Sequence, residues 1–431
     1  MKTVFMSFST DIVHGAHIAI IQKAAALGEL TVGVISDEVV ASYKRFPILS
    51  YCERADIFRS IKGVSAVVCQ TSISGGEYIS LHKPDYVVHG DDWKRDFRST
   101  IRSEVIKLLS AYGGELIEYE SISDEKYAIY EDRAMKRMLT PDIRRGRLRE
   151  LLTLKPLISV IEAHSGLSGL IAENTRIHDN GKVLQFDAMW LSSLCDSTMK
   201  GKPDIELVDL TSRVQTMNDI MEVTSKPLIF DADTGGLPEH FAFTMATLER
   251  LGISAAIVED KVGLKRNSLF GEDAGQTQDT IEGFQNKIHI GKAALKTKDT
   301  MLITRIESLI LGKGQDDALS RAFAYVEAGA DGVMIHSRKK EPDEIFGFCE
   351  QFRARYAHVP LVVVPSTFSQ VSEDELCAYG INIAIYANQL LRASFLAMRD
   401  TAGLILKNHR ALEADKMCLP IDEIIRLIPE K

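Results

Sequence analysis

The sequence predicts an α/β protein of two domains, an N-terminal Rossmann-like parallel sheet followed by a C-terminal (β/α)8 TIM barrel. The chain has 431 residues, which is more than one ordinary hydrophobic core accommodates. Apolar β-type runs alternate with helical segments in both halves, an arrangement typical of parallel sheets covered by helices. From residue 151 onward, eight strand–helix units can be counted, which is the number that closes a barrel.

The first 120 residues form the expected N-terminal domain. Strands are expected at residues 3–7, 30–35, 66–69 and 85–88, and helices at 18–27 and 52–61. Residues 121–147 are highly charged, contain Pro141 and lack apolar periodicity, so we expect a partly helical connector there. The expected division is therefore 1–120, a linker over 121–147, and 148–431.

The second half supplies the barrel strands. They are expected at 157–162, 184–190, 228–231, 255–259, 302–306, 332–336, 361–364 and 381–386, with helices such as 238–251 and 316–328 between them. A polar residue lies at or just past each strand end: His164, Ser192, Asp231, Glu259, Arg305, His336, Ser366 and Asn388. One polar residue after a strand is usually a turn or helix-cap residue. A complete series favours an active site at the barrel face where the strand ends converge.

Composition narrows the class of protein. Hydrophobic residues make up 45% and charged residues 26%, as in globular domains, and the net charge of −9 argues against nucleic acid as a partner. The six cysteines contain no CxxC pair, which favours reduced thiols over disulfides or zinc. The N-terminus lacks a signal-peptide pattern, and no run approaches the roughly 20 apolar residues of a membrane helix. We therefore expect a cytoplasmic protein without a membrane partner.

Two loops at strand ends carry the strongest chemical signal. Asp231 and Asp233 are two residues apart, so a strand would direct both to one side, and Glu259 follows the next strand. These carboxylates predict a hard-oxygen site suited to Mg²⁺, with Asp204 within reach on another loop.

Cationic and amide groups accompany these acids. Arg305 and His336 are donors for a phosphoryl or carboxylate group, and the loop 262–268 offers Lys265 and Asn267 to close over a substrate. The alternative is a solvated rim of salt bridges in a barrel of unrelated purpose.

Seven segments carry a resemblance to a known family. They are EAHSGLSG (162–169), MWLSS (189–193), DADTGG (231–236), EDKVGLKRNS (259–268), TRIESLI (304–310), MIHSRKK (334–340) and YANQLLRAS (386–394). Together they resemble the phosphoenolpyruvate mutase family of the isocitrate lyase/phosphoenolpyruvate mutase superfamily, over residues 145–431. The resemblance implies Mg²⁺-dependent interconversion of phosphoenolpyruvate and phosphonopyruvate, which forms a carbon–phosphorus bond for phosphonate biosynthesis. It also implies a helix-swapped barrel, and hence a homodimer or homotetramer.

The resemblance also assigns roles by position. It implies that Asp231 binds the metal, with Asp233, Glu259 and Asp204 contributing directly or through water. The substrate-binding and catalytic residues that it implies are Trp190 and Ser192 for the pyruvyl unit, Arg305 and His336 for the phosphoryl group, and Lys265, Asn267 and Ser268 on a gating loop.

Other activities of the superfamily remain as alternatives. Lyases carry a catalytic thiol on the corresponding loop, whereas no cysteine lies between Cys195 and Cys349 here. Phosphonopyruvate hydrolase shares most pocket residues, but Asn267 matches the mutases. Ser165 departs from the mutases, which usually have Asn there. A non-catalytic sensor of phosphoenolpyruvate or a nucleotide is the alternative of a different class.

The N-terminal domain has its own motif, Asp11 to His17 (DIVHGAH), after the first strand. Two histidines at a helix start can donate to triphosphate oxygens, although such a pair is more often a packing feature. The segment resembles the HxGH nucleotidyltransferases, and specifically a cytidylyltransferase-like domain. The nucleotide-binding residues that this implies, with CTP as the nucleotide, are His14, His17, Lys44 and Asp91.

Two departures weigh against nucleotidyl transfer. Ala16 replaces the second glycine of the motif, adding a methyl group where backbone and nucleotide pass closely. Residues 122–125 read Ile-Ser-Asp-Glu where the family has a triphosphate-binding Ile-Ser-Ser-Thr, so two carboxylates would face the polyphosphate. A working cytidylyltransferase and a relic that scaffolds the oligomer both remain open, and the relic is favoured.

Overall fold

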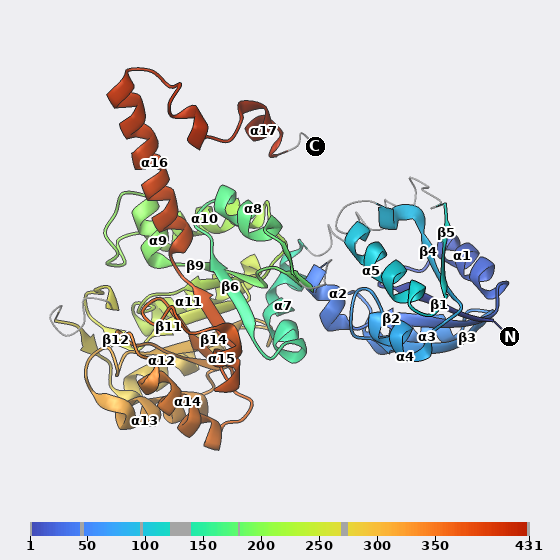
Figure 1. Ribbon diagram of the computed structural model, residues 1–431. Helices are drawn as coiled ribbons and strands as arrows, with labels where there is room; N and C mark the ends of the chain where they lie inside the picture. The colour runs from blue at the N-terminus through green and yellow to red at the C-terminus, as the bar shows by residue number, and fades with distance from the viewer. Residues whose placement is uncertain are drawn as a thin grey trace.

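The computed structural model of the chain describes residues 2–43, 47–94, 98–120, 139–179, 182–268 and 275–428. Two α/β domains follow one another along the chain, as the sequence predicts (Figure 1). Within the described residues, no helix is both long enough and apolar enough to cross a membrane.

The N-terminal domain is a five-stranded parallel sheet in the order β3-β2-β1-β4-β5. Its strands are β1 (Thr3–Phe8), β2 (Glu29–Ile35), β3 (Val64–Gln70), β4 (Tyr86–Gly90) and β5 (Glu115–Tyr119). Its helices are α1 (Gly15–Ala25), α2 (Asp37–Tyr43), α3 (Tyr51–Arg59), α4 (Gly76–His82), η1 (Asp91–Lys94) and α5 (Arg98–Ser110). The strand order reverses at β1, so α1 leaves the sheet at the switch point where such folds bind ligands.

Alternation along the strands gives this sheet two apolar faces. Met6 and Val32 pack with α1 and α3, whereas Phe5 and Val87 pack against α4 and α5. Because successive side chains of a strand point to opposite faces, both faces of the parallel sheet are covered by helices.

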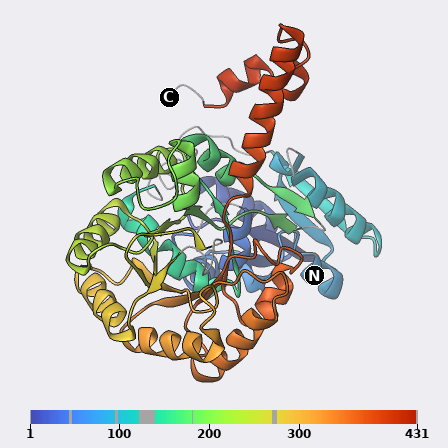
Figure 2. The same cartoon turned by 90° about the vertical axis from the view of Figure 1, so that its left-hand side faces the viewer.

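The second domain is a closed barrel of eight parallel strands in the order β10-β11-β14-β15-β16-β17-β6-β9, which confirms the predicted TIM barrel. The strands are β6 (Ile158–Glu162), β9 (Ala188–Leu191), β10 (Leu228–Asp231), β11 (Ala255–Glu259), β14 (Met301–Ile306), β15 (Gly332–Ile335), β16 (Leu361–Val363) and β17 (Ile383–Tyr386). Figure 2 shows helices in a ring around them.

Two layers of core hold the barrel together. Val160, Ile229 and Ile303 fill the interior, and alternate residues such as Phe230 and Val258 face the outer helices. The outer helices are α8 (Gly166–Asn174), α10 (Leu210–Met221), α11 (Pro238–Leu251), α12 (Ile281–Ala293), α13 (Gly314–Glu327), α14 (Asp343–Arg355) and α15 (Glu373–Ala378), with the short α9 (Ser193–Met199) after β9. Each buried aliphatic side chain contributes roughly 1.5–3 kcal/mol.

Helix α7 (Pro141–Leu154) packs against the barrel interior. Its Leu148 and Leu151 belong to the inner cluster, and Arg144 donates to the backbone oxygens of Met221 and Thr224. This helix crosses the expected boundary at residue 148, which remains a prediction, and residues 121–138 of the expected linker lie outside the described residues.

One strand prediction is wrong in its extent. The run 184–190 was expected to be a single barrel strand, but Leu184 ends β8 (Lys182–Leu184), which pairs with β7 (Ile177–Asp179) in an antiparallel hairpin. The barrel strand β9 begins only at Ala188. The break falls at Asp187, whose carboxylate accepts from Lys155 Nζ at 2.5 Å and from the backbone N–H of Ser159.

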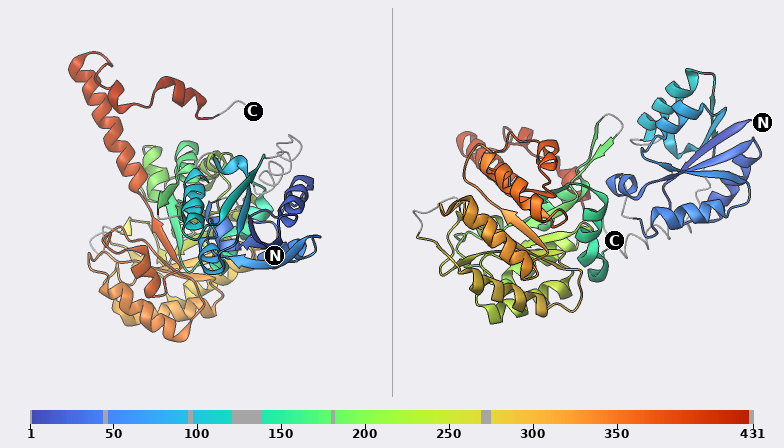
Figure 3. Two further views of the ribbon diagram at one scale, coloured as in Figure 1. Left: turned by 45° about the vertical axis from the view of Figure 1, so that its right-hand side comes forward. Right: turned by 90° about the horizontal axis from the view of Figure 1, so that it is seen from below.

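The chain ends in an arm, residues 389–428, that projects away from the barrel (Figures 1 and 3). It contains α16 (Gln389–Asn408), η3 (Asp415–Met417) and α17 (Ile421–Arg426). Leu391 is the buried residue of α16, while Phe395 and Leu406 are 60% and 74% exposed. On the barrel, Leu167 and Ile171 of α8 are also exposed. Apolar surface is therefore uncovered both on α16 and on the barrel helix α8.

Candidate active site

A pocket lies at the carboxyl ends of the barrel strands. Nine of the residues that the sequence predicts for the site line this pocket: Trp190, Ser192, Asp204, Asp231, Lys265, Asn267, Ser268, Arg305 and His336. Asp233 and Glu259 do not line it, but Asp233 contacts Lys265 and Glu259 lies 3.6 Å from Arg305. The structure thus brings all eleven barrel residues of the expected site into one neighbourhood.

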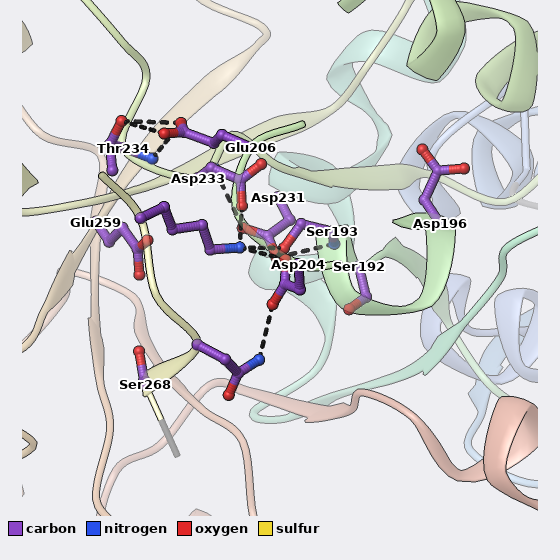
Figure 4. Close-up of polar contacts among 12 residues, drawn as sticks. Ser192, Ser193, Asp196, Asp204, Glu206, Asp231, Asp233, Thr234, Glu259 and Ser268 are labelled. Carbon is purple, nitrogen blue, oxygen red and sulfur yellow. Dashed lines mark hydrogen bonds and ion pairs between the residues drawn. The ribbon is translucent and has the colours of Figure 1, made fainter. Parts of the chain in front are cut away.

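Lys265 lies at the centre of the carboxylates. Its ammonium donates to Asp204 Oδ1 at 2.6 Å, to Ser193 Oγ at 2.7 Å, and to Asp233. Figure 4 shows Asp204, Asp231, Asp233 and Ser193 gathered around these bonds. The loop lysine therefore supplies positive charge to the acids that the sequence assigned to a metal.

Asp231 ends β10 and is held by the start of the neighbouring helix α9. Its Oδ2 accepts from the backbone N–H of Ser193 at 3.1 Å and from Ser193 Oγ at 2.9 Å. Ser193 is thus a bridge, since its hydroxyl donates to Asp231 and accepts from Lys265.

Asp233 reaches the site by a turn and not by strand alternation. Its φ of +53° is left-handed, so Asp233 does not continue the strand. The expectation that a strand directs Asp231 and Asp233 to one side is therefore wrong, although both carboxylates do lie at the site. Gly235 follows at φ +73°, where a Cβ would lie 2.8 Å from the Phe241 ring. Arg213 fixes this turn by donating to Asp231 O at 2.6 Å and to Asp233 Oδ2 at 3.1 Å.

Glu259 is a buried carboxylate with unused hydrogen-bonding capacity. Lys261 Nζ lies 3.1 Å away and Arg305 lies 3.6 Å away, yet neither carboxylate oxygen accepts a hydrogen bond within the described residues. Burial raises the pKa of Glu259 to about 7, against the opposing charges of Arg305 and Lys261. A buried acid of this kind is available to a hydrated cation.

Arg305 and His336 stand together on the phosphoryl side of the expected site. Arg305 donates to Glu307 Oε1 and to Ser268 Oγ, both at 2.6 Å. Nδ1 of His336 is buried and has no hydrogen-bond partner in the described part of the chain. Burial, helped by the charge of Arg305, lowers the pKa of His336 to about 4, so its imidazole is neutral at neutral pH.

The charge of Lys265 is stabilised by its acidic surroundings. Burial alone would lower its pKa, but the carboxylates of Asp233, Asp231, Glu259 and Asp204 outweigh burial and raise it. Lys265 therefore stays protonated and acts as a fixed cation.

The expected gating loop is anchored at its base. The strands β12 (Lys261–Val262) and β13 (Thr277–Gln278) pair as a hairpin, and Asp260 before them accepts from Gln278 and Tyr325. At the tip, Asn267 Nδ2 donates to Asp204 Oδ2 at 2.7 Å. Residues 269–274 of the loop lie outside the described residues.

Several residues that contact the site were not predicted from the sequence. Lys261 and Glu307 were within quoted motifs, and the two-residue spacing from Glu259 and Arg305 could have indicated them. Ser193 also lay in a quoted motif. Arg213 had no sequence signal, because it comes from α10 and only folding brings it to the site. Conversely, the strand-end His164 faces Glu162 at 3.4 Å and does not line the pocket.

The structure describes three of the four candidate nucleotide-binding residues of the N-terminal domain. His14 caps α1, and its backbone N–H donates to His17 Nδ1 at 3.4 Å, with the two rings stacked 3.8 Å apart. Asp91 begins η1 after β4. Lys44 lies outside the described residues. Both histidines thus take part in a local cap at the sheet's switch point.

Models of known protein families match both halves of the chain. The family model described as "Phosphoenolpyruvate phosphomutase" matches residues 148–406, which is more than half of the chain. The model described as "Cytidylyltransferase-like" matches residues 9–146.

Individual relatives match the barrel half. A phosphonopyruvate hydrolase of Variovorax sp. (strain Pal2) is 35% identical over 282 residues, covering 65% of this chain and 93% of the relative. A phosphoenolpyruvate phosphomutase of Streptomyces hygroscopicus is 35% identical over 286 residues, covering 65% of this chain and 86% of the relative. A solved phosphonopyruvate hydrolase in complex with oxalate and Mg²⁺ is 33% identical with a TM-score of 0.59, covering 66% of this chain and 94% of that structure.

Proposed function

Because this chain belongs to the phosphoenolpyruvate mutase family, we propose that its barrel interconverts phosphoenolpyruvate and 3-phosphonopyruvate in an Mg²⁺-dependent isomerisation. The observation that carries the proposal is the meeting of Asp231, Lys265 and Arg305 in one pocket at the strand ends. Carboxylates for a cation beside fixed cations for a phosphoryl group suit a substrate that has both a carboxylate and a phosphate.

The carboxylate side fits Mg²⁺. Asp231 would hold the ion, with Asp233, Glu259 and Asp204 contributing directly or through water. Glu259 supports this role, since its two buried oxygens accept no hydrogen bond in the described residues. When bound, Mg²⁺ would offset the negative charge that develops on the pyruvyl oxygen as the bond between this oxygen and phosphorus breaks. Trp190 on β9 and Ser192, the N-cap residue of α9, would contact the pyruvyl unit.

The basic side would hold the phosphoryl group during its transfer. Arg305 and His336 would donate to the phosphoryl oxygens, and Ser268 is already hydrogen-bonded to Arg305 at 2.6 Å. A neutral His336 can donate one proton in a hydrogen bond without adding charge. The phosphoryl group must remain in place until C3 of the pyruvyl unit attacks it, so fixed donors matter more than a strong base.

The loop would separate isomerisation from hydrolysis. Asn267 bonds to Asp204 and Lys265 bonds to Asp204 and Asp233, which holds residues 265–268 over the pocket wall. A loop held in this way excludes the water that would otherwise capture the phosphoryl group. We therefore favour a mutase over a phosphonopyruvate hydrolase, although both kinds of relative are 35% identical.

The test is a ³¹P NMR time course of the full-length protein with phosphonopyruvate and Mg²⁺. Appearance of phosphoenolpyruvate supports the proposal. Release of inorganic phosphate indicates a hydrolase, and an unchanged spectrum indicates a non-catalytic sensor of phosphoenolpyruvate or a nucleotide. The variant Asp231→Ala should lose turnover while keeping its circular dichroism spectrum, whereas Asp374→Ala, an exposed acid on α15, should not change the rate.

Assembly and location follow as further parts of the proposal. The exposed apolar side chains of α16 support exchange of this helix with a second copy, and hence a homodimer or homotetramer. Six free cysteines support a reducing, cytoplasmic location.

The N-terminal domain is proposed to contribute little nucleotidyl transfer. Its match to a cytidylyltransferase-like family supports CTP as the ligand to test, and the His14–His17 pair at the start of α1 lies where a triphosphate would be expected. The departures at Ala16 and residues 122–125 favour a scaffold, so we expect little release of pyrophosphate from CTP.

A further inference from the structure

Three side chains that could hold a metal ion lie close together, do not line the pocket and have no role in the proposed reaction. Glu162 ends β6, His164 follows that strand, and Cys195 lies in the first turn of α9. All three are buried, with exposed fractions of 0%, 8% and 0%. Their ligand atoms, one from each residue, lie within 4.8 Å of one another.

The distances suit a shared ion better than a strong pairwise bond. His164 Nδ1 lies 3.4 Å from Glu162 Oε2, which is long for a charge-assisted hydrogen bond. Bonds of roughly 2.0–2.3 Å at tetrahedral angles place neighbouring ligand atoms about 3.4–3.7 Å apart. Small side-chain movements would therefore bring the three atoms to ligand spacing.

Other contacts hold the ligands from behind, as outer partners do in metal sites. Glu162 Oε1 accepts from the backbone N–H of Leu391 at 2.5 Å, which leaves Oε2 on the side of His164. The Cys195 thiol donates to Ala387 O at 3.3 Å, a bond that is lost when the thiol gives up its proton to bind a metal ion. Among the described residues, the ion-pair partner of Glu162 is His164, and a histidine is charged only when it is protonated. This buried carboxylate therefore has no lysine or arginine as a permanent cation in the described part of the chain.

We propose that Glu162, His164 and Cys195 form a second metal site, which binds a transition-metal ion of the Zn²⁺ class. A thiolate with an imidazole selects Zn²⁺ over Mg²⁺, so the site is chemically distinct from the carboxylates around Asp231. On binding, the thiol proton of Cys195 leaves to solvent and a metal–sulfur bond replaces it. Water or a nearby carbonyl oxygen completes the coordination.

The site joins three elements at the root of the arm. Leu391 lies in the first turn of α16, and its backbone N–H is bonded to Glu162. A bound ion therefore fixes the base of α16 to β6 and α9. This inference does not depend on the mutase activity and would stand without it.

The test uses Co²⁺, because sulfur-to-cobalt charge transfer absorbs in the near ultraviolet and carboxylate ligands give no such band. The full chain carries Cys52→Ser, Cys69→Ser, Cys377→Ser and Cys418→Ser, which leaves the buried Cys195 and Cys349. The protein is stripped with a chelator and titrated with Co²⁺ in excess Mg²⁺, which occupies the carboxylate site.

We expect a charge-transfer band that saturates near one ion per chain and is displaced by Zn²⁺. Cys195→Ser should abolish the band, and Cys349→Ser, which changes the other buried thiol, should retain it. His164→Gln should weaken Co²⁺ binding more than about 100-fold, since removing a metal ligand costs more affinity than removing a residue that only bonds to a ligand. A missing band in the parent protein, or a band unchanged by Cys195→Ser, overturns the proposal. A circular dichroism spectrum of each variant checks that it is folded.

Discussion

Replacing Lys265 by methionine tests how the carboxylate cluster is neutralised. Lys265 is 5% exposed and bonds to Asp204, Asp233 and Ser193. Methionine keeps an unbranched side chain, one atom shorter, but removes the charge and all three bonds. Two buried carboxylates then lose their shared cation.

The expected loss of stability is worked from those contacts. Removing one partner of a buried ion pair costs about 3–5 kcal/mol. Asp233 keeps Arg213 at 3.1 Å and Asp204 keeps Asn267 at 2.7 Å, so we expect the lower end, about 3 kcal/mol. Because more negative charge remains in Lys265→Met, Mg²⁺ should stabilise this variant more than it stabilises the wild type.

The assay is urea unfolding of the barrel, followed by far-ultraviolet circular dichroism with and without saturating Mg²⁺. Lys226→Met is the matched control, since Lys226 is 9% exposed and donates to Phe186 O at 2.7 Å, away from these acids. That control should lose stability equally with and without Mg²⁺. The reasoning is refuted if Lys265→Met is as stable as the wild type without Mg²⁺, or if Mg²⁺ stabilises both proteins equally.

Four further outcomes are expected. The pKa of His336 is about 4 when folded and about 6.5 when unfolded, so its contribution to stability is present above pH 6.5 and is lost as the pH falls toward 4. Between pH 7.5 and 5.0 this amounts to about 2 kcal/mol, and His336→Gln should be less acid-sensitive than the wild type in urea unfolding by that amount. Asn267→Ala removes the bond to Asp204 and should shift the ³¹P products of phosphonopyruvate from phosphoenolpyruvate toward inorganic phosphate; an unchanged ratio would contradict the role given to the loop. Leu406→Asp, at a position 74% exposed on the arm, should lower the molar mass measured by light scattering, and an unchanged oligomer would exclude that face of α16 from the interface. Pyrophosphate release from CTP should be weak and unchanged in His17→Ala; strong release that this substitution abolishes would mean that the N-terminal domain is an active transferase.

The motif residues could be found from the sequence because strand ends converge in a barrel. Once β10 and β11 were placed, Asp231 and Glu259 had to meet at the same face. The turn at Asp233 was not predicted, because two acids spaced two residues apart suggested a continuing strand. The extent of β9 was misjudged because Phe186 and the residues around it continue an apolar pattern through a break at Asp187.

The amino-acid order by itself determined the fold class, the eight barrel strands and the acids and cations at their ends. It could do so because strand periodicity and strand-end position are local properties of the chain. Only the tertiary structure decided which residues contact one another. It places Lys265 among the carboxylates, Arg213 against the Asp233 turn, and Cys195 beside His164. These contacts join residues tens of positions apart, and the packing of whole elements sets their distances.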